Sequence, residues 1–207
     1  MVNEAPGVDA WDAWRPEEVA ERLEGSPVPW AVAAGWAVDL FLGRETRGHG
    51  DLEIAVPADR FGEIRERFDD CDFFVAGDGR VTPLAPDETP TGEHHQTWAL
   101  ERASRRWRLD VFREPADGDT WICRRDPTIR RPYAEVRWFT TDGIPYLAPE
   151  IVLLFKAKGS RPKDVDDLAR VLPLLDGARR RWLTAALARV HPGHPWLGRV
   201  GYPTLGD

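Results

Sequence analysis

The stretch Gly43–Val56, "GRETRGHGDLEIAV", places the tightest constraint on how this chain can fold. It begins as a polar loop and ends in strict alternation of polar and apolar residues. On a β-strand, alternate side chains point to opposite faces of the sheet. We therefore expect Leu52, Ile54 and Val56 to face a core, while Asp51 and Glu53 point the other way. This predicts a strand over residues 51–56 that carries two carboxylates on one face.

A second acidic position follows the same pattern in "RRWRLDVF", residues 105–112. Trp107, Leu109 and Val111 are expected on one face of a strand, with Asp110 on the other. Acids are rare at buried strand positions unless they are paired or bound to metal. Three converging carboxylates would suit Mg²⁺, which prefers oxygen ligands and leaves positions for water and substrate phosphates. The alternative is that these acids simply face solvent.

The surrounding pattern predicts an α/β (α+β) chain, with a mixed sheet flanked by helices up to residue 147. We expect an α/β domain over residues 1–147 and a helical region over 148–207 packed on it. The predicted strands cover residues 30–34, 51–56, 72–77, 94–100, 105–112 and 120–125. The predicted helices cover residues 15–25, 36–43, 57–68, 149–159, 162–175 and 178–190, and a Pro/Gly-rich tail follows.

Composition narrows the class of protein. The chain has 207 residues, a formal net charge of −7, ten tryptophans and two cysteines without CxxC spacing. No apolar run approaches the roughly 20 residues of a membrane span, and the N-terminus has no secretory pattern, so a cytoplasmic protein is expected. The acid excess disfavours a nucleic-acid partner without excluding one, and it favours a cationic small molecule. One or two tryptophans are expected to line a ligand pocket, but their identity is open.

Three segments together resemble a known superfamily. "AGWAVDLFLGRETRGHGDLEIAV", "RLDVF" and "LLFKAKGSRPKDVDDL" look like the polymerase-β-like nucleotidyltransferases, closest to the aminoglycoside and lincosamide branch that includes aminoglycoside 2''-adenylyltransferases. The resemblance covers roughly residues 28–175. It departs from the pattern at Ala34, where a first glycine would stand, and at Glu53, where a second aspartate would stand.

The resemblance implies a Mg²⁺-dependent enzyme that transfers NMP from an NTP, with ATP expected, to a hydroxyl of a small molecule such as an aminoglycoside-like antibiotic. By that resemblance Asp51 and Glu53 are metal ligands, and Asp110 is a third ligand or a general base. The residues expected near the nucleotide are Gly35, Trp36, Arg44, Thr46, His49, Lys156 and Lys163. A monomer or a homodimer is expected.

Three alternatives stay open at this point. The first is a nucleotidyltransferase-fold toxin that modifies RNA or protein. The second is a non-catalytic relative that only binds nucleotide. The third concerns single residues: Lys156 at a helix C-terminus, and Asp164 and Asp167 near a helix N-terminus, are also what the helix dipole alone would favour.

Overall fold

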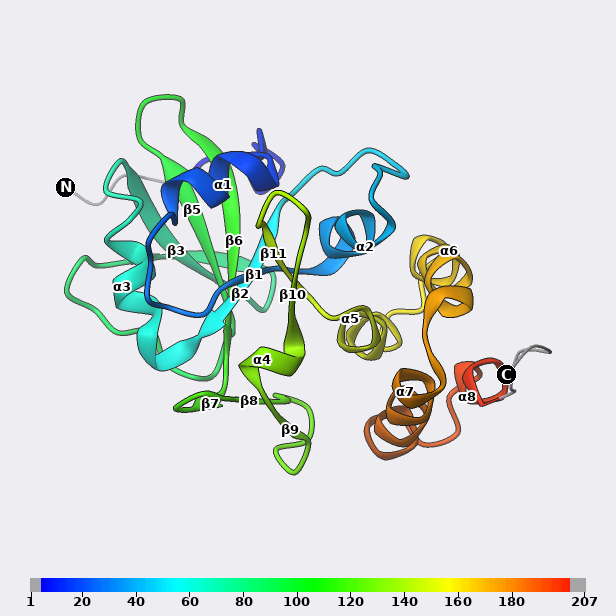
Figure 1. The fold of residues 1–207 in the computed structure, drawn as a ribbon. Helices are drawn as coiled ribbons and strands as arrows, with labels where there is room; N and C mark the ends of the chain where they lie inside the picture. The colour runs from blue at the N-terminus through cyan, green and yellow to red at the C-terminus, as the bar shows by residue number, and fades with distance from the viewer. Residues whose placement is uncertain (1–4, 202–207) are drawn as a thin grey trace.

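A computed structural model describes residues 5–201 and contains a mixed sheet of eight strands (Figure 1). Their order in space is β10-β11-β1-β2-β6-β5-β3-β4. The strands are β1 (Ala31–Val32), β2 (Glu53–Pro57), β3 (Cys71–Gly77), β4 (Arg80–Leu84), β5 (Gln96–Glu101), β6 (Arg106–Glu114), β10 (Arg137–Phe139) and β11 (Pro145–Leu147). A second sheet joins β7 (Ala116–Asp117), β8 (Thr120–Ile122) and β9 (Arg130–Pro132). The predicted α/β class is confirmed.

The alternation in residues 51–56 is observed in the packing of β2. Leu52, Ile54 and Val56 are buried, as predicted. The strand begins at Glu53 rather than at Asp51, which lies exposed in the preceding loop. Strand β2 pairs with β6 in parallel, with Glu53 opposite Asp110. The two acidic positions predicted separately are therefore neighbours in the sheet.

One predicted facing is wrong, and a β-bulge is the reason. Leu109 and Val111 lie in the main core, whereas Trp107 lies in a second cluster with Phe74 and Leu100. The register between β5 and β6 shifts between Ala99 and Leu100. The extra residue is Arg108 in β6, because Ala99 pairs with Leu109 and Leu100 pairs with Trp107. Such an extra residue breaks the alternation of side chains between the two faces. Trp107 therefore shares the face of Asp110.

The helices cover the sheet from two directions. Helices α1 (Pro16–Arg22), η1 (Ala58–Arg60) and α3 (Phe61–Arg65) lie beside the sheet, on the side away from the C-terminal helices (Figure 1). Phe61, Ile64 and Phe68 are buried at their predicted helical spacing. Helices α2 (Ala34–Leu42) and α5 (Pro149–Lys156) lie between the sheet and the remaining helices (Figure 1). These are α6 (Pro162–Val171), η2 (Leu172–Leu174), α7 (Gly177–Val190) and α8 (Trp196–Val200).

The predicted Pro/Gly-rich tail contains a helix, α8, which was not expected. Trp196 and Val200 bury its apolar side against the core. The short helix α4 (Tyr133–Val136) and the strands β4, β7, β9, β10 and β11 were also not predicted. The predicted boundary at residues 147 and 148 falls between β11 and α5, and its status as a domain boundary stays a prediction. No helix in residues 5–201 is long and apolar enough to cross a membrane.

Candidate functional site

A cavity of about 480 Å³ lies between the β2–β6–β5 part of the sheet and the helix α5. The sheet contributes carboxylates and aromatic side chains. The helix and the loop after it contribute Val152, Phe155 and cationic side chains. The other residues that line it include Trp11, Ala33, Ala34, Asp51, Glu53, Gln96, Trp98, Asp110, Glu114, Arg124, Arg125, Lys156, Lys158, Arg161 and Asp164.

The three predicted acids line this cavity together. Glu53 and Asp110 are register partners on adjacent parallel strands, and Asp51 stands two residues before Glu53. Asp110 is only 3% exposed. Its Oδ2 accepts a hydrogen bond from Gln96 Nε2 at 2.6 Å, while its Oδ1 has no hydrogen-bond partner among the described residues. One oxygen of Asp110 is thus fixed and the other is available.

Burial and the negative charges of neighbouring carboxylates raise the pKa values of Glu53 and Asp110. Burial, and then the charges of Asp51 and Asp110, raise the pKa of Glu53 to about 8, against the opposing charges of Lys156 and Lys163. Burial also raises the pKa of Asp110 to about 7, although hydrogen bonding from Gln96 and from Trp98 opposes the shift. Carboxyl groups with such raised pKa values attract a cation strongly once they ionise.

Mg²⁺ fits this donor set. Among residues 5–201, no group of three or more His, Cys, Asp or Glu side chains is arranged closely enough to hold a metal ion without other ligands. Mg²⁺, however, is commonly held by one or two carboxylates, with water and substrate phosphates as its other ligands. Glu53 and the free Oδ1 of Asp110 supply such a pair, and Asp51 adjoins them on an exposed loop. The chemistry of these donors suits a hard divalent cation.

Cationic side chains also line the cavity, and most of them were not predicted. The Arg124 guanidinium lies 4.1 Å from the ring of Phe155 and pairs with the buried Glu114. Arg125 donates to the carbonyls of Leu154 and Phe155, each at 3.1 Å. Lys158 and Arg161 complete this set. "TWICRR" was interpreted only as a strand, and adjacent arginines carry no local signal that distinguishes a cavity from a surface.

Lys156 lies in the last turn of α5 and Asp164 in the first turn of α6, as the helix-dipole interpretation expects, and Lys156 is in addition paired with two acids. Its Nζ lies 3.3 Å from Asp164 Oδ1 and 2.8 Å from Asp167 Oδ2. All three side chains are buried. The acids therefore serve a buried ion-pair network that reaches the cavity. Lys163 is exposed and does not line the cavity, although its charge lowers the pKa of nearby Glu53.

The loop of residues 43–50 is organised around Asp39, a residue not singled out from the sequence. Thr46 Oγ1 donates to Asp39 Oδ1 and His49 Nε2 lies against Asp39 Oδ2, both at 2.6 Å. Burial tends to raise the pKa of Asp39, but these hydrogen bonds outweigh it and the pKa lies below its usual value. The His49 ring stacks on Trp36 with centroids 4.4 Å apart.

Gly35 is required by this packing. A Cβ at Gly35 would stand 2.8 Å from His49 Nδ1 and would also collide with Arg47. Gly35, Trp36, Arg44, Thr46 and His49 do not line the carboxylate cavity, and Arg44 and Trp36 instead border a separate hollow. Ala34, at the departure from the Gly-Gly pattern, does line the cavity. It has a positive φ of 50°.

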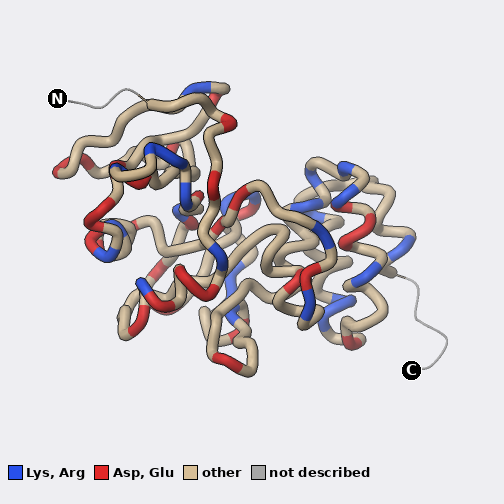
Figure 2. The backbone as a smooth tube through the Cα atoms, turned by 90° about the horizontal axis from the view of Figure 1, so that it is seen from above, with Lys and Arg blue, Asp and Glu red and all other residues tan. Residues whose placement is uncertain are grey.

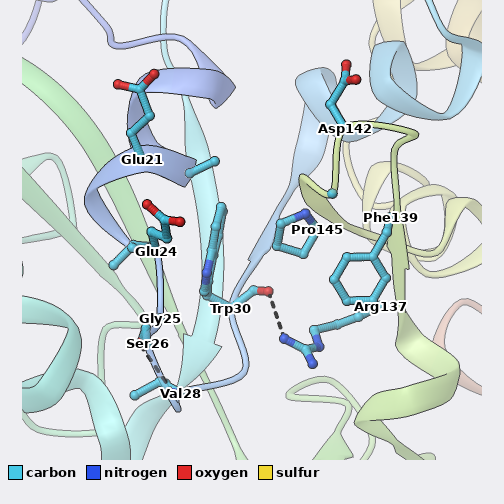
Figure 3. Close-up of a pocket in the computed structure, with 13 residues that line it drawn as sticks. Glu21, Glu24, Gly25, Ser26, Val28, Trp30, Arg137, Phe139, Asp142 and Pro145 are labelled. Carbon is cyan, nitrogen blue, oxygen red and sulfur yellow. Dashed lines mark hydrogen bonds between the residues drawn. The ribbon is translucent and has the colours of Figure 1, made fainter.

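Another hollow, of about 520 Å³, lies between α1 and the β10–β11 hairpin (Figure 3). Glu21, Glu24 and Asp142 stand on its rim. Its cation, Arg137, already donates to the carbonyl of Trp30 at 3.4 Å. None of the predicted site residues lines it. The carboxylate cavity is therefore the stronger candidate for a catalytic site.

Comparison with known proteins agrees with the fold and with the family that the sequence resembles. The family model "Aminoglycoside-2''-adenylyltransferase" matches residues 17–88, which include Asp51 and Glu53. The 2''-aminoglycoside nucleotidyltransferases of Escherichia coli and Klebsiella pneumoniae are 43% identical over 37 residues. That match covers 18% of this chain and 21% of the relative, so the chain spans about a fifth of the length of these curated relatives.

Solved structures match over far more of the chain. The solution structure of the antibiotic-resistance factor ANT(2'')-Ia has a TM-score of 0.56 at 16% identity, covering 84% of this chain and 89% of that one. ANT(2'')-Ia with adenylyl-2''-tobramycin also has a TM-score of 0.56, at 14% identity, covering 84% of this chain and 95% of that one. The lincomycin-bound lincosamide adenylyltransferase LnuA has a TM-score of 0.51 at 17% identity, covering 74% and 91%. The resemblance to the aminoglycoside-2''-adenylyltransferase family is therefore confirmed, by sequence over residues 17–88 and by a shared fold over most of the chain.

Proposed function

We propose that this protein is a Mg²⁺-dependent nucleotidyltransferase that moves NMP from an NTP, with ATP the expected donor, to a hydroxyl of a small cationic molecule. One observation carries the proposal. Glu53 and Asp110 stand opposite each other on parallel strands, in a cavity that Arg124, Lys156 and Lys158 also line. Such a cavity can hold a divalent cation and a triphosphate together, which is what in-line nucleotidyl transfer requires.

The distribution of charge supports this assignment. Residues 149–200 contain ten Lys or Arg and five Asp or Glu, although the whole chain is acidic. Figure 2 shows basic residues spread over this helical end. Lys156, Lys158 and Arg161 are the members of this set that line the cavity, where they would contact triphosphate oxygens. Cationic side chains are suited to neutralise phosphate charge as it shifts in the transition state.

In the proposed reaction the acceptor oxygen attacks the α-phosphorus, a new O–P bond forms, and the bond from that phosphorus to the bridging oxygen breaks. Pyrophosphate leaves with the bond's electron pair. Asp51, Glu53 and Asp110 would hold Mg²⁺, which when bound neutralises charge on the phosphates. Asp110 is also the group placed to take the hydroxyl proton.

Pyrophosphate release from Mg-ATP tests the proposal, with tobramycin and lincomycin as acceptors because relatives bind them. The wild type should release pyrophosphate with at least one acceptor. Asp51→Asn should reduce release to background while circular dichroism is unchanged, since Asp51 is exposed and the change preserves volume. Asp142→Asn, at an exposed acid outside the cavity, is the matched control. Full activity in Asp51→Asn would refute the assignment.

A non-catalytic nucleotide-binding role is the second candidate. The two departures from the family's pattern favour it: Ala34, which lines the cavity with a positive φ of 50°, and the longer carboxylate side chain of Glu53. Calorimetry separates the two candidates. Mg-ATP binding without pyrophosphate release for any acceptor would support binding alone, and an absence of both would leave only the shared fold.

A further inference from the structure

The loop of residues 123–129, here called the arginine loop, joins β8 to β9 and brings Arg124 and Arg125 to the cavity. The Cys123 amide donates to the Ile129 carbonyl at 2.9 Å, and the Ile129 amide donates to the Asp126 carbonyl at 3.0 Å. These bonds close the loop on itself. The small sheet β7–β8–β9 therefore presents both arginines from a fixed turn.

Arg125 attaches the arginine loop to the end of helix α5. Its guanidinium donates to the carbonyls of Leu154 and Phe155, each at 3.1 Å, and lies 4.8 Å from the Phe155 ring. Helix α7 contacts the same loop, where Arg189 donates to Asp126 at 3.0 Å. Two helices therefore set the position of the loop, and both Nη atoms of Arg125 already donate to protein carbonyls.

Arg124 is oriented by contacts that leave part of its guanidinium open. Its Nη1 donates to Glu114, which is buried at 2% exposure. The guanidinium carbon lies 4.1 Å from the ring of Phe155 and 5.7 Å from that of Phe112. Among residues 5–201, Nε and Nη2 of Arg124 donate to no protein group. The side chain is only 19% exposed, so these two donors lie in a largely desolvated place.

The open donors of Arg124 match the geometry of a phosphate group. Nε and Nη2 share one edge of the planar guanidinium, and such an edge makes two parallel N–H···O bonds to phosphate oxygens. Arg124 lines the same cavity as Asp110, and its charge acts on that carboxyl. The open edge is therefore near the carboxylates that would hold Mg²⁺. An anion bound at both groups is a phosphate of the nucleotide or the pyrophosphate that leaves.

We infer that Arg124 is a phosphate-binding residue of the cavity and that Glu114 is the residue that positions its guanidinium. This inference rests on the proposed function. Glu114 fixes Nη1, and the rings of Phe112 and Phe155 fix the plane of the guanidinium. Nε and Nη2 are then aligned for phosphate oxygens before the nucleotide binds. A donor that is already ordered loses less entropy on binding.

A purely structural ion pair is the competing interpretation of Glu114 and Arg124. A buried carboxylate needs a cation, and Arg124 would then serve only to neutralise it. The two interpretations differ in what a conservative change affects. A structural pair would affect the free energy of unfolding alone. A phosphate-binding arginine would affect the affinity for pyrophosphate and ATP, and leave the KM of the acceptor unchanged.

The test uses Arg124→Lys, which keeps the charge but removes the forked donors, and Glu114→Gln, which keeps an acceptor oxygen but removes the charge. Arg130→Lys and Asp117→Asn are the matched controls, because these residues form an exposed ion pair at 3.5 Å on the same small sheet, outside the cavity. Calorimetry measures the binding of pyrophosphate with Mg²⁺. Steady-state kinetics give separate KM values for ATP and for whichever of tobramycin and lincomycin the wild type modifies. Urea unfolding measures stability.

Arg124→Lys should raise the pyrophosphate dissociation constant and the KM for ATP by roughly tenfold, which is the usual effect of one lost charge-assisted hydrogen bond. Glu114→Gln should change both in the same direction by roughly threefold, because the guanidinium is less firmly held. The acceptor KM should stay constant in both variants. The two controls should match the wild type in every measurement.

Unchanged pyrophosphate and ATP constants in Arg124→Lys, with normal wild-type turnover, overturn the inference alone, whether or not stability falls. A raised acceptor KM with unchanged pyrophosphate affinity assigns Arg124 to the acceptor and also overturns it. Normal constants in a folded Glu114→Gln overturn the positioning role of Glu114, and if that variant does not fold, Arg124→Lys decides. A wild type without Mg-ATP binding or turnover overturns the proposed function, and this inference with it.

Discussion

Ala34 is in the left-handed region, with φ of 50°, and replacing it with glycine should stabilise the protein. A Cβ in this conformation costs about 1–2 kcal/mol, and glycine has no such penalty. Glycine also gives the unfolded chain more freedom, which offsets about 0.4–1 kcal/mol. The net gain expected for Ala34→Gly is therefore about 0.5–1 kcal/mol. For a chain of this length that corresponds to a rise in Tm of about 1–4 °C.

The neighbouring residue provides the control. Ala33 is extended, with φ of −120° and ψ of −178°, and it is buried. Ala33→Gly gains nothing from the backbone and loses both a buried methyl and unfolded-state restriction, so it should destabilise by roughly 1–2 kcal/mol. Urea unfolding of both variants measures the two free energies. Equal losses in the two would show that the left-handed φ of Ala34 has no cost, and the reasoning would fail.

The same variant should also change ligand binding. Ala34 lines the cavity and opens α2, where the first backbone N–H groups have no helical acceptor. Anions are favoured at such a terminus. Removal of the methyl group lets a phosphate approach these N–H groups more closely. We therefore expect Ala34→Gly to tighten Mg-ATP binding in calorimetry, while Ala33→Gly, which adds no freedom at a left-handed position, should not.

Three further predictions concern the charged groups. Glu53→Asp restores the shorter carboxylate, so calorimetric Mg-ATP affinity should hold or rise, and a clear loss would count against Glu53 as a ligand. In EDTA, the urea midpoint should fall from pH 6 to pH 9, because Glu53 and Asp110 bind protons in the folded state up to pKa values of about 8 and 7 that the unfolded chain has already released. Mg²⁺ should reverse part of that fall, and a flat profile would show that these carboxyls ionise normally. Lys156→Met removes the buried cation between Asp164 and Asp167, which keep only their contacts with the more exposed Arg161, Arg170 and Arg47, so the unfolding free energy should drop by roughly 1–3 kcal/mol. An unchanged unfolding free energy would mean that these groups are not buried as described.

The parts of the fold that sequence predicts are those governed by local periodicity. The alternation around Leu52 and Ile54 identifies β2, and the helical spacing of Phe61, Ile64 and Phe68 identifies the segment after it. Asp110 could be placed on the cavity side because its strand neighbours Leu109 and Val111 are apolar. Each of these inferences needs only residues within one element.

The missed features depend on contacts between distant segments. The facing of Trp107 depends on a bulge set by pairing with β5, which local alternation does not encode. Trp11 lines the cavity only because the backbone of residues 10–14 is hydrogen-bonded to β6. A lysine such as Lys156 is expected at any helix C-terminus. Its pairing with Asp164 and Asp167 depends on how α6 packs against α5, which the local sequence does not encode. Short elements such as β10 and α8 lack enough residues for a periodic signal.

The net charge of the whole chain likewise does not predict which ligand the cavity favours. A total of −7 favours a cationic ligand, yet the helical end beyond residue 148 is rich in Lys and Arg. Carboxylates and cations line the same cavity, and the charges of Lys156 and Arg124 act on Glu53 and Asp110. Salt in solution screens the field of the net charge beyond about 10 Å, whereas charged groups inside a cavity act on a ligand directly. A triphosphate and a cationic acceptor can therefore both be favoured at one site, and the sign of the net charge selects neither.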